Sequence, residues 1–190
     1  MFKNILAFIG FIAIVVSGVL YMSVKNTLSE FDPGAANTYS ELFTNILKNK
    51  NAVEATVWRF PVEEGLTPDD VEKSLKMIAN ELNISNVGEL PLSKDITAKS
   101  GKQFRFVKIF LFCNSLTAAQ MLEHNDAFSA YLPCRISLIE DKTGKLWLYT
   151  LNMDLMIHGG TPLPPALKAE AENVKKIILE IMERAAEGDF

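Results

Sequence analysis

One stretch, Phe104 to Tyr149, constrains the fold more than any other part of the chain. Its first segment, Phe104 to Phe112, reads FRFVKIFLF and carries only two charges, Arg105 and Lys108. Because side chains alternate across a strand, both faces of its C-terminal half are apolar. This pattern predicts a central strand that is covered on both sides, by helices or by a partner subunit.

The rest of the stretch predicts a helical connection followed by a hairpin. Asn114 or Ser115 is suited to cap a helix over about 116–123, and Asn125 with Asp126 ends it. A strand is expected over 134–139 and its hairpin partner over 145–151, joined by a turn that contains Gly144.

The two cysteines of the chain, Cys113 and Cys134, lie at strand ends within this stretch. The connection between them is long enough for a parallel crossover, which needs about a dozen residues. A crossover moves Cys134 away from Cys113, so we expect free thiols at opposite ends of parallel strands. An antiparallel return of the chain would instead allow a disulfide.

Three segments of this stretch resemble a known family. LFCN at 111–114, LPCRISLIED at 132–141 and KLWLYTLN at 145–152 are similar to the family catalogued as domain of unknown function 302. The resemblance spans about 53–152 and rests on Cys113, Asn114, Leu132–Cys134 and Arg135. It implies a single layer of strands with packed helices and no assigned activity.

The N-terminal run Ile5 to Val24 contains no charge. Twenty apolar residues are enough to span a hydrocarbon core of about 30 Å. We expect an uncleaved anchor, since Ser17–Val19, the nearest cleavage-like sequence, lies inside the run. Lys3 on one side, with Glu30 beyond the other, favours a cytoplasmic N-terminus and an extracytoplasmic domain, periplasmic in a Gram-negative cell.

The remaining segments predict the domain organisation. We expect a transmembrane anchor over 1–26, a juxtamembrane helix and linker over 27–51, an α+β domain with a mixed sheet over 52–160, and a C-terminal helix over 161–190. The juxtamembrane helix is amphipathic, and docking on the domain is favoured over lying on the membrane. Strands are expected over 52–60 and 84–90, and a loop over 152–165. The apolar positions of the juxtamembrane helix are Tyr39, Leu42, Phe43, Ile46 and Leu47.

Two groups of residues are candidates for chemistry. A thiol site would use Cys113 and Cys134 with Asn114 and Arg135, because a helix N-terminus after Cys113 favours a thiolate; the alternative is that both cysteines are small buried hydrophobes. A weaker metal candidate combines Met153, Met156 and His158, since thioether and imidazole groups suit Cu(I).

Three functions remain open at this point. The first is a non-enzymatic binding or assembly subunit with a protein partner or a second copy of the chain; the second is a thiol-dependent redox or sulfur-handling protein; the third is a small-ligand or metal carrier. No cofactor is expected. The formal charge of −4 and the lack of a basic stripe argue against nucleic acid as a partner.

Overall fold

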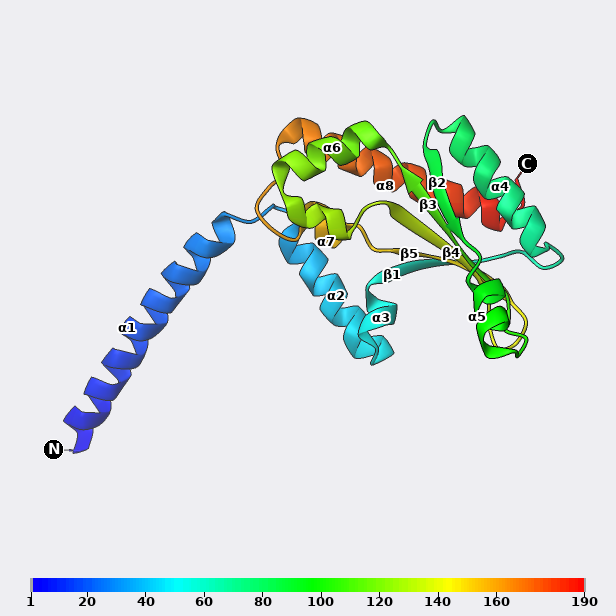
Figure 1. Cartoon of the computed structure of the whole chain (residues 1–190). Coiled ribbons are helices and arrows are strands. Elements are labelled where there is room, and N and C mark those ends of the chain that lie inside the picture. The colour runs from blue at the N-terminus through cyan, green and yellow to red at the C-terminus, as the bar shows by residue number, and fades with distance from the viewer. Residues whose placement is uncertain (1, 190) are drawn as a thin grey trace.

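The computed structural model describes residues 2–189, and Figure 1 shows one long helix leading into a domain of helices packed on a sheet. Met1 and the side chains of Phe2 and residues 4–9, part of the predicted anchor, lie outside the described residues. The helices are α1 (Phe2–Ser29), α2 (Ala35–Asn49), α3 (Ala52–Ala55), α4 (Pro68–Glu81), α5 (Leu92–Ser100), α6 (Ser115–His124), α7 (Asp154–His158) and α8 (Pro165–Ala186), with a 3-10 helix η1 (Asp126–Ala130). The strands are β1 (Val57–Pro61), β2 (Ser85–Leu90), β3 (Val107–Cys113), β4 (Cys134–Glu140) and β5 (Leu146–Leu151).

The sheet has the order β1-β5-β4-β3-β2, and every neighbouring pair is antiparallel. The predicted α+β class is therefore confirmed. The predicted parallel relation between the strands that carry the cysteines is wrong. Phe112 of β3 lies opposite Cys134 of β4, and the register runs on to Val107 opposite Ile139.

The connection between β3 and β4 explains this error. The Asn114 side chain accepts the N–H groups of Leu116 and Thr117, at 3.1 and 3.2 Å, and so starts α6 directly after β3. Helix α6 then packs on α8, with Thr117 and Met121 buried, and η1 brings the chain back to the end of the sheet that it left. A connection of this length permits a crossover but does not require one.

Helices α4 and α8 cover one face of the sheet, as Figure 1 shows. Helix α4 begins with a capping box, in which Thr67 and Asp70 each bond the other's backbone N–H. Its apolar face meets α8 and the sheet in one core. The fully buried members of that core include Val71, Leu75, Ile78, Phe110, Phe112, Ile136, Leu138, Leu148, Ile178, Ile181 and Met182.

The described helices leave the opposite face of the sheet half covered. Ile109 and Leu111 of β3 and Ile139 of β4 are only partly buried there, and Arg135 is exposed. Figure 1 shows α2 with α3 near one end of this face and α5 near the other. A second covering layer, expected from the two apolar faces of β3, is supplied only in part by the described residues.

Two further predictions need correction. The segment predicted as strand from residue 52 starts instead as helix α3, because the Asn51 side chain accepts the Val53 N–H and caps it, so that β1 begins only at Val57. The predicted loop after β5 contains the short helix α7, started by the Asn152 side chain, which accepts the Asp154 N–H at 2.8 Å.

Candidate functional site

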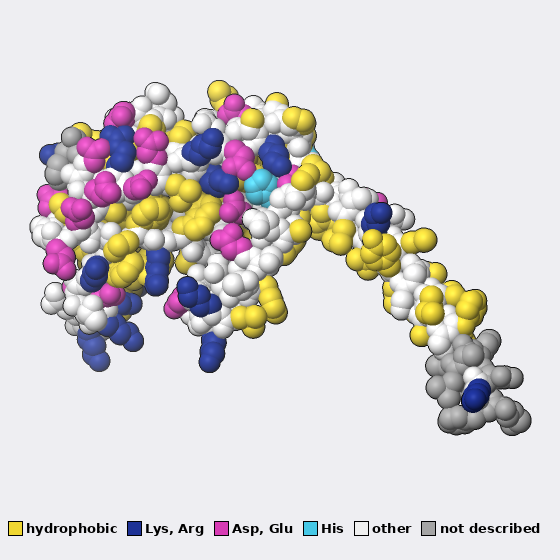
Figure 2. All heavy atoms as spheres, turned by 180° about the vertical axis from the view of Figure 1, so that it is seen from behind, with side chains coloured by type: hydrophobic (Ala, Val, Ile, Leu, Met, Phe, Trp, Pro, Cys, Tyr) yellow, Lys and Arg dark blue, Asp and Glu magenta, His cyan; other side chains and the backbone are white. Residues whose placement is uncertain are grey.

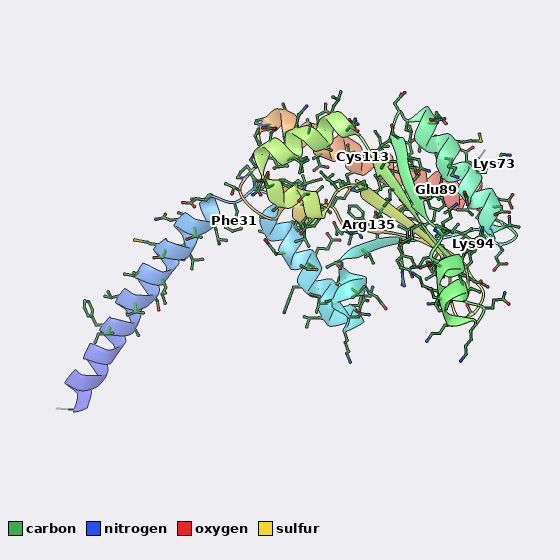
Figure 3. All side chains as sticks on the ribbon, in the orientation of Figure 1. Phe31, Lys73, Glu89, Lys94, Cys113 and Arg135 are labelled. Carbon is green, nitrogen blue, oxygen red and sulfur yellow. The ribbon has the colours of Figure 1, made fainter. Side chains whose placement is uncertain are left out.

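The antiparallel register brings the sulfur-containing side chains of three segments to one end of the sheet. Cys113 ends β3 and Cys134 begins β4, next to the paired residue Phe112. Both cysteines are free thiols and both are partly buried. Met153 and Met156, which flank the start of α7, reach the same place from the far end of β5. Figure 3 labels Cys113 at the upper end of the sheet, beside α6.

These side chains line a small apolar cavity of about 30 Å³. A volume of this size holds about one water molecule or one ion. Met121 of α6 adds a fifth sulfur to the four that the sequence had suggested. The wall is completed by Phe112, Asn114, Thr117, Ala118, Leu132, Ala171 and Val174. A second cavity of about 20 Å³ shares Cys134, Met153 and Met156 and is also lined by Tyr131, Arg135, Thr150, Leu151 and Asn152.

The surroundings of Cys134 keep it protonated at neutral pH. Burial in this apolar site, helped by the neighbouring Cys113 thiol, raises the pKa of Cys134 to about 11. A neutral buried thiol is a poor nucleophile, because the thiolate is the reactive form. A metal ion that binds this thiol has to displace its proton.

His158, predicted as a partner of Met153 and Met156, belongs to a different cluster. Its Nδ1 lies 3.1 Å from Asp32 Oδ1, and its Nε2 lies 2.8 Å from Glu172 Oε1. Lys168 also bonds Asp32, and Lys175 bonds Glu172 at 2.7 Å. The predicted group of two methionines and a histidine is thus divided between a sulfur site and an ion cluster.

The ion cluster joins the segment after α1 to the domain. Asp32 is buried, its N–H donates to Gly160 O at 2.8 Å, and its Oδ1 accepts the Gly34 N–H. Burial alone would raise the pKa of Asp32, but hydrogen bonds from Lys168, Gly34 and His158 outweigh it and lower this pKa to about 2. The carboxylate is charged at neutral pH and fixes the junction.

Arg135 and Asn114 have different roles around the thiols. Asn114 lines the cavity and caps α6, so it positions the helix beside Cys113. The backbone oxygen of Arg135 accepts a hydrogen bond from the Thr150 hydroxyl at 2.7 Å. The Arg135 side chain is exposed on the half-covered face of the sheet, below Cys113 in Figure 3. Three residues of the predicted thiol site, Cys113, Asn114 and Cys134, line the cavity of about 30 Å³. The fourth, Arg135, lines the second cavity of about 20 Å³.

Sequence reasoning missed Met121 and the ion cluster. Met121 follows Thr117 by four residues, so the inward face of α6 was a signal that could have found it. Asp32 gave no such signal, because its partners come from α7 and α8, far along the chain. Among residues 2–189, no three His, Cys, Asp or Glu side chains gather as a metal site, so sulfur is what distinguishes the cavity.

A much larger hollow lies at the opposite end of the sheet and has a different character. It measures about 560 Å³, opens to solvent and lies between the loop after β1 and the β4–β5 turn. Glu63, Glu64, Glu140 and Lys145 are the charged residues around it. Asp141, in the same turn, is held by hydrogen bonds from Thr143, Lys145 and Trp147, so this region is a well-bonded turn.

Comparisons with known proteins agree with this architecture. The sequence model of the family described as "Domain of unknown function DUF302" matches residues 58–185, which extends through α8. No curated protein matches the chain. One similar solved structure is that of an uncharacterised conserved DUF302 protein from Bacillus stearothermophilus, with a TM-score of 0.56 at 16% identity. The similarity covers 68% of this chain and 98% of that one, and at this identity it shows the fold alone.

Proposed function

Since the chain belongs to the DUF302 family of domains of unknown function, we propose its role from the site: a membrane-anchored binding protein that carries one soft metal ion, Cu(I). The observation that carries this proposal is the convergence of Cys113, Cys134 and the methionines 121, 153 and 156 on one cavity of about 30 Å³. Copper(I) is the first-row ion that thiolate and thioether ligands select. The ion would be cargo, and the protein would perform no reaction on it.

The cavity suits an ion better than an organic substrate. Ligand pockets for small molecules usually measure about 300–1,000 Å³, whereas this cavity holds about one water-sized sphere. Its wall is mostly apolar, with Phe112 and Val174 beside the sulfur-containing side chains. Cys113 and Cys134 would give up their protons to the ion, and the thioethers would complete its coordination.

The first helix supports the proposed location. Gly10–Ser29 of α1 is long and apolar enough to cross a membrane and is fully exposed on the described chain. We propose that it spans the membrane with the N-terminus in the cytoplasm and the domain outside. A protein partner or a second copy remains part of this proposal, since a carrier must receive and release its ion; the half-covered face with Ile109 and Leu111 offers room for one.

A competition titration tests the metal proposal directly. The full chain would be kept in mild detergent with its thiols reduced and not alkylated. It would then compete with a chromogenic chelator for Cu(I). We expect one ion per chain, with Cys113→Ser and Cys134→Ser each weakening binding at least about tenfold. Met153→Leu should weaken it to a similar degree.

The chain offers a matched control for the methionine variants. Met77 lies exposed on α4, away from the cavity, so Met77→Leu should leave the affinity within about twofold of the parent. Equal losses for Met77→Leu and Met153→Leu, or an affinity unaffected by either serine variant, would refute the copper site.

The antiparallel register favours one second candidate, a reversible thiol–disulfide pair. Cys113 follows Phe112, the residue that pairs with Cys134, and both cysteines line the same cavity. An extracytoplasmic compartment permits disulfides. Alkylation before reduction, followed by mass spectrometry of peptides from the native membrane, separates the two functions. A linked Cys113–Cys134 peptide pair would favour redox chemistry, and two alkylated thiols would favour the metal carrier.

A further inference from the structure

Helix α2 carries a continuous apolar stripe that the domain does not cover. Tyr39, Phe43 and Leu47 are spaced four residues apart, so they lie on one side of the helix. Their exposed fractions are 46%, 62% and 61%, which are typical of surface residues. Two of the three are nevertheless large aromatic side chains. Val53, at the start of α3, is 71% exposed nearby.

The same helix is fixed to the domain along a different and narrow side. Ala35 and Thr38 are buried, and α2 contacts α3 and α7. Tyr39 Oη donates to Gly159 O at 2.5 Å, which ties the first turn of α2 to the end of α7. The predicted docking of α2 on the domain is therefore real, but from the stripe it uses only the Tyr39 hydroxyl, and it leaves the Tyr39 ring half exposed and Phe43 and Leu47 free.

The position of α2 in the chain indicates what covers the stripe. Only Glu30–Gly34 separate it from α1, the helix long enough to cross a membrane. Figure 1 shows α2 turning away across the direction of α1 instead of continuing it. In Figure 2, hydrophobic side chains gather on the projecting part formed by α2 and α3, on the side that faces α1.

We propose that α2 lies in the membrane interface, with Tyr39, Phe43 and Leu47 inserted at the level of the lipid headgroups. Aromatic side chains are favoured at that depth, and an amphipathic helix lies flat when its apolar side is buried there. Glu41 and Lys48 lie on the exposed polar side of α2, away from the stripe, and their charges balance. The partner is therefore the lipid surface itself, without a requirement for anionic lipid.

The consequence is a domain with a fixed orientation on the membrane. The Asp32 cluster with His158 and Lys168 fixes the segment between α1 and α2 to the domain, close to the end of the proposed anchor. The sulfur cavity would then lie at a set height above the bilayer. This inference depends on α1 crossing the membrane and does not depend on the metal site.

Quenching by brominated lipid tests the proposal on the full chain. Phe43→Trp, on the stripe, and Glu41→Trp, on the polar side, would be reconstituted in phosphatidylcholine vesicles with brominated acyl chains. After subtraction of the parent signal from Trp58 and Trp147, we expect the fluorescence of Phe43→Trp to fall about twofold, because interfacial helices bury their apolar side about 5–10 Å deep. The fluorescence of Glu41→Trp should not change, and Leu47→Trp provides a second stripe position should Phe43→Trp misfold.

Three results would overturn the inference in distinguishable ways. Equal quenching at both positions would mean that the stripe does not orient α2 in the interface. No quenching at Phe43→Trp and Leu47→Trp, while the protein stays in the vesicles after alkaline carbonate, would mean that α2 stands in water. Release of the parent chain by carbonate would overturn the anchor and the interfacial helix together, whereas the copper titration would be unaffected.

Discussion

Cys134 shows how a single residue ties the fold to the proposed chemistry. It starts β4 opposite Phe112, and burial raises the pKa of its thiol to about 11. A metal ion has to displace that proton, so metal affinity and pH are coupled.

The first prediction follows from this coupling. The apparent Cu(I) affinity should rise by at least about tenfold per pH unit between pH 6 and 8, because Cys134 is protonated throughout this range and loses its proton on binding. In Cys134→Ser the dependence should be weaker by about one proton per ion. Chelator competition across this pH range measures both slopes, and a parent affinity that is independent of pH would show that the thiols are not ligands.

Asp32 gives a second prediction at the same scale. Its pKa is lowered to about 2, so its contribution to folding is fully present above its usual range near 4 and is lost as the pH falls through about 2. The lowering corresponds to about 2 kcal/mol for this buried carboxylate. Asp32→Asn should therefore destabilise the detergent-solubilised full chain by about this amount at pH 7, in denaturant melts.

The difference between Asp32→Asn and the parent should shrink below about pH 4. Glu41→Gln, which removes an exposed carboxylate from α2, is the control and should change stability by less than about 0.5 kcal/mol at either pH. A difference at Asp32 that stays constant down to pH 2 would attribute the loss to packing instead of charge.

The candidate residues could be recognised in the sequence, but their convergence could not. Cys113, Cys134, Met153 and Met156 stood out because soft ligands are chemically distinctive. Whether they meet depends on strand direction, which the length of the connection between β3 and β4 does not determine. His158 was misassigned because its partners, Asp32 and Glu172, are distant in sequence and give no local pattern.

At the scale of elements, hydrophobic periodicity predicted the long helices well. Leu75 of α4 and Ile178 of α8 lie within the apolar stripes that the sequence showed, and both are fully buried. The short elements α3 and α7 were missed, because one turn of helix is set by a single capping side chain such as Asn51. The half-covered face of the sheet shows another limit of sequence reasoning. Apolar residues on both faces of a strand predict a covering layer, but they do not indicate whether the same chain or a partner supplies it.

The packing of α4 and α8 gives the third prediction. Leu75→Ala and Ile178→Ala should each cost about 2–4 kcal/mol of unfolding free energy, because each opens a cavity in the shared core. Glu180→Ala, an exposed position of α8, should cost less than about 0.5 kcal/mol. Denaturant melts of the full chain give these values, and equal losses at Ile178 and Glu180 would contradict the packing of α8.

At the scale of the molecule, the proposed anchor and the proposed interfacial helix would hold the domain against a membrane. In this proposal α1 would be the anchor and α2 a second contact with the lipid surface. The Asp32 cluster fixes the segment between these two helices to α7 and α8. Charge around the anchor gives only the direction of insertion, through Lys3 and Glu30.

That direction gives the fourth prediction. A C-terminal epitope tag should be accessible to antibody or protease on cells whose outer barrier has been opened and whose cytoplasmic membrane is intact. A tag detected only after lysis of the cytoplasmic membrane would reverse the orientation and place the thiols in a reducing compartment.

The most direct test of the central claim is X-ray absorption at the copper edge on the full chain loaded with one Cu(I). We expect a first coordination shell made of sulfur alone, which loses a scatterer in Cys134→Ser and is unchanged in Met77→Leu. A shell of nitrogen or oxygen atoms that is identical in the parent and in Cys134→Ser would place the ion elsewhere and contradict the sulfur-lined site.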